Sequence, residues 1–149
     1  MGHSFRLRVY YEDTDLAGIV YYANYFKFIE RARSNALSAV GIDQLKLRAT
    51  KMFFVVKKVD ADFIAPAIFN DELLVTTELL EIKGARLNLR QIILRDDQII
   101  FTSEIKLAFI FNDRPIKFSI DFTNKCCLSY LALTVCIQRI DIQTKSTYS

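Results

Sequence analysis

One change of hydrophobic period limits the fold of this chain more than any other feature. Between residues 25 and 40, apolar side chains recur at steps of three and four residues, which predicts a helix of about four turns. They are Tyr25, Phe28, Ile29, Ala32, Ala36 and Val40. From residue 52 to 111 the chain is rich in β-prone residues, and apolar and polar side chains alternate, which is typical of half-buried strands.

Turn-forming residues divide this second part into four antiparallel strands. The turns fall at Ala65-Pro66, Asn70-Asp71, Lys83-Gly84, Asp96-Asp97 and Asn112-Asp113-Arg114-Pro115. A β-prone run from Arg6 to Tyr11 adds a first strand before the helix. Gly41 is expected to cap the C-terminus of the helix. Phe26 and Leu37 widen the apolar face of the helix, so that only a narrow polar strip remains. We therefore predict an α+β fold in which a five-stranded antiparallel sheet wraps one long helix.

Length and composition limit the class of protein. The 149 residues suit one domain, and 52% apolar and 25% charged residues exclude disorder and fibrous repeats. A net charge of +3 is too small for a dedicated nucleic-acid binder, although an anionic small ligand stays open.

Processing signals and reactive side chains are few. The first residues lack the apolar core of a secretion signal, and three cysteines without a Cys-x-x-Cys spacing argue against disulfides and a zinc site. A cytoplasmic location is the simplest expectation. The only histidine is His3, close to the terminus, so mechanisms that need a buried imidazole are disfavoured.

The last part of the chain has a different pattern. We assign residues 1–118 to one domain and residues 119–149 to an apolar C-terminal extension. Ten of the twelve residues from Cys126 to Ile137 are apolar, a run too short to span a bilayer. A buried strand or helix and a surface anchor or partner contact both stay open for this run.

The segment Val9–Tyr25 carries the most specific pattern: the end of a strand, an acidic loop, a glycine and a tyrosine-rich turn into the helix. With Glu30 and Arg33 behind it, this segment strongly resembles the signature of hotdog-fold acyl-CoA thioesterases. The branch is that of the 4-hydroxybenzoyl-CoA thioesterases and the YbgC proteins encoded beside the Tol-Pal envelope system. The resemblance covers about residues 4 to 118. It implies hydrolysis of a short-chain or aromatic acyl-CoA, or of an acyl carrier protein thioester.

The resemblance also implies site residues. It places the catalytic carboxylate at Asp15, which either attacks the thioester carbon or activates water. It places the group that polarises the carbonyl oxygen at the backbone N–H of Tyr22, where the first N–H groups of a helix lack intrahelical partners. In an extended loop, Asp13 would lie on the same side as Asp15 and close to it. Further substrate-binding positions are Gly18, Ile19, Val20 and Tyr25.

Coenzyme A is a polyanion, so cations are expected at the mouth of its site. The stretch Lys46–Lys58 holds five cations and no acid, and residues 83–86 form a basic turn. By the resemblance, these segments lie near the nucleotide, and Lys57, Lys83 and Arg86 are the preferred contacts. A merely solvated charged face is the alternative. No cofactor is expected besides the coenzyme A of the substrate.

Association is expected from the last strand. If the edge of this strand were bare, its predicted apolar face would favour pairing with another subunit. That face consists of Ile99, Phe101, Ile105, Leu107, Phe109 and Phe111. The resemblance implies a homodimer or homotetramer with sites between subunits, and peripheral association with the envelope division machinery is compatible with it.

Simpler interpretations of the same residues stay open. The acidic loop could only cap the helix, and a calcium loop is disfavoured because Ala17 and Asn24 stand where ligands are required. A surface ion pair between Glu30 and Arg33 is preferred to a catalytic Glu30. Tyr21, Tyr22 and Tyr25 could be plain core aromatics.

Other functions are weighed against hydrolysis. A non-catalytic module that binds acyl-CoA or an envelope protein is the main alternative. A hotdog dehydratase would need a histidine at its site, and a hotdog transcription regulator would need a DNA-binding domain for which the chain has no room.

Overall fold

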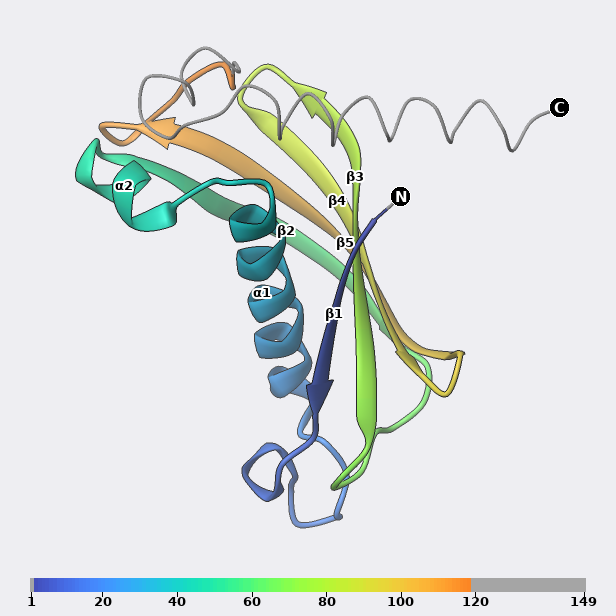
Figure 1. The fold of residues 1–149 in the computed structure, drawn as a ribbon. Coiled ribbons are helices and arrows are strands. Elements are labelled where there is room, and N and C mark those ends of the chain that lie inside the picture. Colours follow the sequence, from blue (N-terminus) through green and yellow to red (C-terminus); the bar gives the residue numbers. More distant parts are fainter. Residues whose placement is uncertain (1, 119–149) are drawn as a thin grey trace, which may run out of the picture.

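The computed structural model describes residues 2–118, which form a curled antiparallel sheet around one long helix (Figure 1). The elements follow in the order β1 (His3–Arg8), a 3₁₀ turn (Tyr11–Asp13), α1 (Tyr22–Ala39), α2 (Gln44–Ala49), β2 (Met52–Phe63), β3 (Glu72–Lys83), β4 (Arg86–Arg95), β5 (Gln98–Phe111) and β6 (Arg114–Pro115). The long strands lie in the order β1-β3-β4-β5-β2, and the short β6 pairs with β5. The predicted α+β architecture is confirmed. The predicted extension 119–149 lies outside the described residues.

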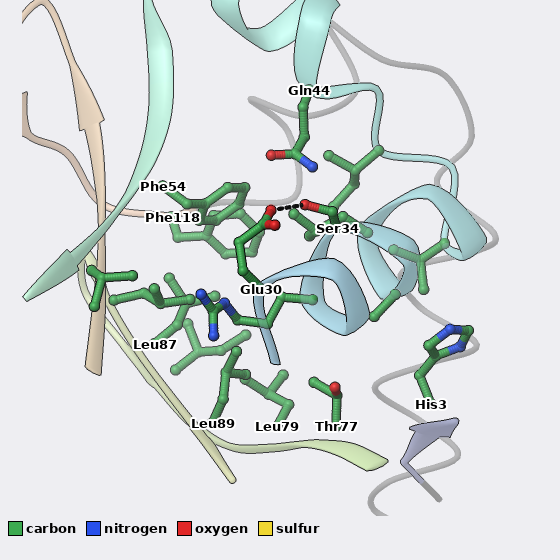
Figure 2. A pocket seen from close by; sticks show the side chains of 18 residues that line it. His3, Glu30, Ser34, Gln44, Phe54, Thr77, Leu79, Leu87, Leu89 and Phe118 are labelled. Atoms are coloured by element: carbon green, nitrogen blue, oxygen red, sulfur yellow. Dashed lines mark hydrogen bonds between the residues drawn. The ribbon is translucent and has the colours of Figure 1, made fainter. Parts of the chain in front are cut away.

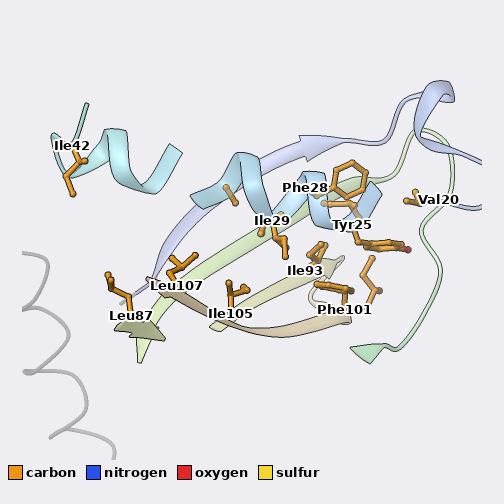
Figure 3. Packing of buried hydrophobic residues seen from close by; sticks show 14 of the residues in the cluster. Val20, Tyr25, Phe28, Ile29, Ile42, Leu87, Ile93, Phe101, Ile105 and Leu107 are labelled. Carbon is orange, nitrogen blue, oxygen red and sulfur yellow. The ribbon is translucent and has the colours of Figure 1, made fainter. Parts of the chain in front are cut away.

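Helix α1 lies on the concave side of the sheet because its apolar face is wide. Phe28, Ile29 and Ala32 are buried against the sheet and belong to one core cluster with Ile93 and Phe101 (Figure 3). Burying a side chain of the size of Phe or Ile stabilises a fold by about 1.5–3 kcal/mol. The helix ends near Gly41, which has a φ of 83° and donates its N–H to the Ser38 carbonyl at 3.0 Å.

The first strand differs from the prediction. It runs from His3 to Arg8, not from Arg6 to Tyr11, because the chain turns after Val9. The Tyr10 N–H donates to the Asp13 carboxylate at 2.8 Å, and residues 11–13 form a 3₁₀ turn. A local side-chain hydrogen bond thus outweighs the β-propensity of the tyrosines.

The inner face of β5 also differs from strict alternation. Ile99 is 45% exposed, while Ile100 and Phe101 are both buried. The register of β4 and β5 shifts between Ile93 and Leu94, opposite this point, and such a bulge changes which side chains face inward. Ile99 therefore does not belong to the predicted apolar face.

The long strand β5, considered above as a possible bare edge, is not an edge strand of the sheet. β5 pairs with β4 on one side and with β2 on the other, so its edges are covered within the chain. The edge strands are β1 and β2. The reason given for association, a bare edge on the last strand, is therefore wrong.

Helix α2 was missed in the sequence. Its capping residue Asp43 accepts hydrogen bonds from the N–H groups of Leu45 and Lys46 at 2.9 and 3.2 Å. Within residues 2–118, no helix combines the length and apolar character needed to cross a membrane.

Candidate active site

A tight loop holds the predicted catalytic carboxylate. The Asp15 N–H donates to the Ile19 carbonyl at 2.8 Å, and the Asp15 carbonyl accepts from the Gly18 N–H at 3.0 Å. Gly18 has a φ of 81°, a conformation that favours glycine. The Asp15 side chain is exposed, and its Oδ1 accepts from the Ala17 N–H at 2.9 Å. One carboxylate oxygen thus stabilises the loop, and the exposed side chain stays accessible from solvent.

The loop leads directly into the N-terminus of α1. Tyr21 is the capping residue of this helix, and its side chain makes no capping hydrogen bond. No acidic residue lies in the first turn. Among the hydrogen bonds of the described residues, none uses the backbone N–H of Tyr22 or Ala23 as a donor. These N–H groups and the helix dipole can therefore stabilise a negative oxygen.

Asp13 joins the loop to the helix instead of forming a pair with Asp15. It is buried, and its carbonyl accepts from the Tyr21 N–H at 2.9 Å and from the Asn24 side-chain amide at 2.8 Å. The expectation that Asp13 and Asp15 share one side of an extended loop is wrong, because the 3₁₀ turn directs Asp13 inward. Asn24 was not predicted as a site residue; the signal for it was a single polar residue in the tyrosine-rich first turn.

Exposed aromatic rings surround the start of the helix. Tyr22 is 58% exposed, and its ring packs edge-on against Tyr21 at 4.9 Å and against Phe63 at 6.3 Å between centroids. A hydrogen bond with Tyr22 raises the pKa of Tyr21, and the nearby charge of Asp15 raises it further. The structure thus brings Asp15 close to the start of α1. These exposed rings make the start of α1 a candidate binding surface.

The two remaining predicted loop positions, Ile19 and Val20, differ in exposure. Ile19 is exposed and bridges to Ile68, while Val20 is buried in the core and its N–H donates to the Ala67 carbonyl at 2.8 Å. The loop is thereby fixed to the segment that connects β2 and β3.

Tyr25 belongs to the core of the chain. It is only 3% exposed, its ring stacks on Phe101 at 5.3 Å, and its hydroxyl accepts from the Ala67 N–H at 3.0 Å. Burial raises the pKa of the Tyr25 hydroxyl. Tyr25 therefore connects the helix to the segment at Ala67 within the core, and its predicted contact with an acyl group stays a prediction.

The predicted coenzyme A contacts lie away from Asp15 within one chain. Lys83 and Arg86 are exposed at the turn between β3 and β4, at the end of the sheet opposite the loop of residues 9–21 (Figure 1). The 12 residues of β3 span about 36 Å between these two ends. Lys57 is exposed at an irregularity in the pairing of β2 with β5. A single chain does not bring Lys83 and Arg86 to the carboxylate.

The expected ion pair on the helix is absent. Arg33 donates to the Gln91 side-chain oxygen at 2.8 Å, and Glu30 accepts from the Ser34 hydroxyl at 2.7 Å. Gln91 is fully buried and also donates to the Ile29 carbonyl at 2.9 Å. Burial lowers the pKa of Arg33, and the charge of Glu30 partly offsets this. The prediction of a surface pair is wrong because Arg33 turns toward a strand that is distant in sequence.

A separate cavity of about 300 Å³ lies between the C-terminal half of α1 and the sheet (Figure 2). Neither Asp15 nor Tyr22 lines it.

Within residues 2–118, no group of three His, Cys, Asp or Glu side chains could hold a metal ion.

Comparison with known proteins identifies the family. The model of the Thioesterase-like superfamily matches residues 9–143. An acyl-CoA thioesterase YbgC from Haemophilus influenzae is 39% identical over 110 residues, which cover 73% of this chain and 81% of the relative. The chain belongs to the Thioesterase-like superfamily.

Solved structures show the same fold. The crystal structure of a probable thioesterase from Bartonella henselae is 34% identical, with a TM-score of 0.71, and covers 79% of this chain and 98% of that one. A 4-hydroxybenzoyl CoA thioesterase mutant, complexed with 4-hydroxybenzoyl CoA, is 21% identical with a TM-score of 0.76; the match covers 84% of this chain and 98% of that one and supports the fold alone. The predicted hotdog fold and the predicted family are confirmed. The prediction that the protein is an enzyme of the thioester hydrolase class is confirmed as well.

Proposed function

We propose that this member of the superfamily hydrolyses acyl-CoA thioesters at the junction of the Asp15 loop and helix α1. The observation that supports this most directly is the placement of an exposed carboxylate next to a helix start where the N–H groups of Tyr22 and Ala23 have no acceptor among residues 2–118. A thioester carbonyl needs both parts: a nucleophile or base at its carbon and a donor at its oxygen. The YbgC relative is named for this activity.

In the proposed reaction, the carbonyl oxygen accepts from the Tyr22 N–H, and the helix dipole stabilises the charge that develops there. By one route, a carboxylate oxygen of Asp15 attacks the carbonyl carbon, the carbon–sulfur bond breaks, and coenzyme A leaves as the thiolate. Water then cleaves the mixed anhydride and restores Asp15. By the other route, Asp15 takes a proton from water, the hydroxide attacks the carbon, and the proton passes to the leaving thiolate. Both routes give a free acid and coenzyme A.

The acyl group would be short-chain or aromatic, carried by coenzyme A or by an acyl carrier protein. The exposed rings of Tyr21, Tyr22 and Phe63 beside Asp15 support an apolar or flat acyl group. Gly18 and Ile19 would line the entrance, and no cofactor besides the coenzyme A of the substrate is proposed.

A second copy of the chain would complete the site. Lys83 and Arg86 do not reach Asp15 within one chain, whereas a partner in a homodimer or homotetramer can present these cations and Lys57 to the nucleotide. The free edge of β2 and the apolar surface around Tyr22 support such an association. We also propose a cytoplasmic location, with peripheral contact to the envelope division machinery as an extension of the family resemblance.

Release of thiol from a panel of acyl-CoAs tests the proposal. Asp15→Asn is expected to lower kcat by about 10²–10⁴, the contribution of a positioned acid–base group. Glu12→Gln is the matched control, because Glu12 is an exposed carboxylate of the same loop and its variant should keep the activity. Equal rates for Asp15→Asn and the unchanged protein would contradict the mechanism.

A non-catalytic module that binds acyl-CoA or an envelope protein is the second candidate. It is favoured by the hydrogen bond from the Ala17 N–H to Asp15, which gives the carboxylate a structural role. Saturable binding of acyl-CoAs without turnover across short, long and aromatic chains would support this candidate.

A further inference from the structure

The loop that carries the proposed catalytic carboxylate is held at both ends by the segment between β2 and β3. At the start of the loop, the Val9 N–H donates to the Asp71 carbonyl at 2.9 Å. At its end, the Val20 N–H donates to the Ala67 carbonyl at 2.8 Å. Residues 66–71, here called the connecting turn, therefore help to determine where the loop lies.

One guanidinium group closes the connecting turn. Arg95, at the end of β4, donates from its Nη1 to the Pro66 carbonyl and to Asp71 Oδ2, both at 2.9 Å. The same Asp71 oxygen accepts from the Ile68 N–H at 2.9 Å. One nitrogen thus joins the two ends of the turn, and the carboxylate also fixes the backbone between them.

This ion pair is better shielded from water than the others. The side chains of Arg95 and Asp71 are 27% and 17% exposed, whereas both partners of every other ion pair within residues 2–118 are at least 45% exposed. Charge-assisted hydrogen bonds are stronger than neutral ones, and salt screens a partly buried pair less than an exposed pair. The pair is therefore suited to hold the turn in one position.

The connecting turn reaches Asp15 through a single residue of the loop. Ile68 of the turn forms an antiparallel bridge with Ile19, and the Ile19 carbonyl accepts from the Asp15 N–H at 2.8 Å. The hydrogen bonds of the Arg95 side chain within residues 2–118 go to the turn and not to the loop. The connection from Arg95 to Asp15 is thus indirect and passes through the turn.

We propose that Arg95 is a positioning residue: together with Asp71, it fixes the connecting turn and so holds the Asp15 carboxylate where it meets the thioester. This role rests on the proposed function of Asp15. A displacement of about 1 Å at a reacting group can cost about 10²-fold in rate, so a residue that only holds the loop can have a large effect on kcat.

Steady-state thiol release from acyl-CoAs tests this role. Arg95→Gln should lower kcat by about 10–10² and change KM by less than about threefold, because the rings and cations proposed to bind the substrate are left in place. Arg95→Lys should keep kcat within about fivefold of the unchanged protein, since a single nitrogen makes both bonds and lysine also carries several donors on one nitrogen.

Arg90→Gln is the matched control. Arg90 lies on the same strand as Arg95, and its ion pair with Glu104 at 3.1 Å is exposed, so its variant should keep the activity. Unchanged kcat in Arg95→Gln, or equal losses in Arg95→Gln and Arg90→Gln, would overturn the proposal.

A double-mutant cycle separates positioning from general stabilisation. If Arg95 acts through Asp15, Arg95→Gln should change the residual kcat of Asp15→Asn by less than about threefold, although it lowers kcat of the unchanged protein by at least about tenfold. Equal factors in both backgrounds would overturn the proposal and assign Arg95 to the overall fold. Full activity of Asp15→Asn would contradict the proposed function itself, whereas a strong loss in Asp15→Asn beside full activity of Arg95→Gln would overturn only the role of Arg95.

Hydrogen exchange followed by mass spectrometry tests the same role without an activity assay. The N–H groups of residues 9–21 should exchange at least about tenfold faster in Arg95→Gln than in Arg90→Gln, while the buried part of α1 should exchange equally in both. Equal exchange of the loop in the two variants would overturn the proposal.

Asp71→Asn breaks the same ion pair from the other side and keeps an oxygen for the Ile68 N–H, so it provides a milder second variant if Arg95→Gln does not fold. It should show the same faster exchange in residues 9–21 and a fall in kcat of at least about fivefold with little change in KM. Exchange and kcat equal to those of the unchanged protein would overturn the proposal.

Discussion

The two helices of this protein begin in opposite ways. At α2, the Asp43 carboxylate accepts from the N–H groups of Leu45 and Lys46 and so occupies the helix start. At α1, Tyr21 offers no side-chain acceptor, and the first turn contains no acid. A capping side chain typically stabilises a helix by about 1 kcal/mol, so the longer and more central helix lacks a stabilisation that the short one has.

The proposed function uses this open helix start to bind the substrate. Helix α1 is held by other means: the buried face of Phe28 and Ile29, and the hydrogen bonds that join Asp13 to Tyr21 and Asn24. These contacts fix the helix without using the N–H groups of Tyr22 and Ala23. In the proposed function, these donors bind the carbonyl oxygen of the substrate.

Closing the start of α1 should have the largest effect. Tyr21→Asp adds a capping acceptor and a negative charge where α2 has one. The added carboxylate would bond the N–H groups of Ala23 and Asn24, the positions that Asp43 uses at α2, and its charge would oppose a negative oxygen at the Tyr22 N–H. It should lower kcat by about 10²–10³, while the helix gains about 0.5–1 kcal/mol. Steady-state thiol release and urea unfolding measure the two effects.

Tyr21→Asn is the control for this change, because it caps the helix without a charge. A smaller loss of activity for Asn than for Asp would separate the occupied donors from the added charge. Full activity of the Asp variant would show that the first-turn amides do not take part.

Removing the contact that holds the open helix should cost stability. Asn24→Ala leaves the Asp13 carbonyl without its buried side-chain donor, so the free energy of unfolding should fall by about 1–3 kcal/mol. Asn35→Ala on the same helix removes only an exposed bond to His3 and should change stability by at most about 0.5 kcal/mol. Urea unfolding distinguishes them, and equal losses would argue against a role of Asn24 in holding the loop.

Opening the start of α2 gives the reverse test. Asp43→Ala should lower the free energy of unfolding by about 0.5–2 kcal/mol and leave kcat unchanged, because its carboxylate caps α2 and takes no part in the proposed reaction. A change in kcat of more than about tenfold would mean that the two helix starts are not functionally distinct.

The smallest effect concerns the pH dependence of stability at Tyr25. Burial raises the pKa of this hydroxyl above its ordinary value of 10.0. In the unfolded chain the hydroxyl loses its proton near pH 10, while the folded chain retains it, so this group's contribution to stability is lost as the pH rises above 10.

Tyr25→Phe removes this group, so the stability difference between the unchanged protein and the variant should narrow from pH 9 to pH 11. Near neutral pH the variant should lose about 0.5–1.5 kcal/mol with the hydrogen bond to Ala67. Urea unfolding at several pH values measures both. A difference that is constant with pH would contradict the assignment of Tyr25 to the core.

The elements predicted from the sequence are those with a long hydrophobic period. Helix α1 and the four strands after it were found because each buries one face, and that requirement is written into local spacing. Helix α2 was missed because six residues give less than two turns of periodicity, and its cations were interpreted as part of a charged stretch.

Features set by distant contacts could not be predicted. Arg33 was paired with Glu30 three residues away, whereas its partner Gln91 lies 58 residues along the chain. The exposure of Ile99 depends on a register shift with β4, and the position of β5 inside the sheet depends on the strand order. The candidate site was predicted at Asp15 and Tyr22 from the family resemblance, whose signature lies in one continuous segment of the sequence. The cavity and the role of Asn24 required the fold.

The most direct test of the central claim is a crystal structure of Asp15→Asn with a hydrolysis-resistant acyl-CoA thioether ketone bound. The account predicts the ketone oxygen about 2.7–3.1 Å from the Tyr22 backbone nitrogen, with the side chain of residue 15 beside the carbonyl carbon. A ligand whose carbonyl lies away from both groups in every subunit of the assembly would contradict it.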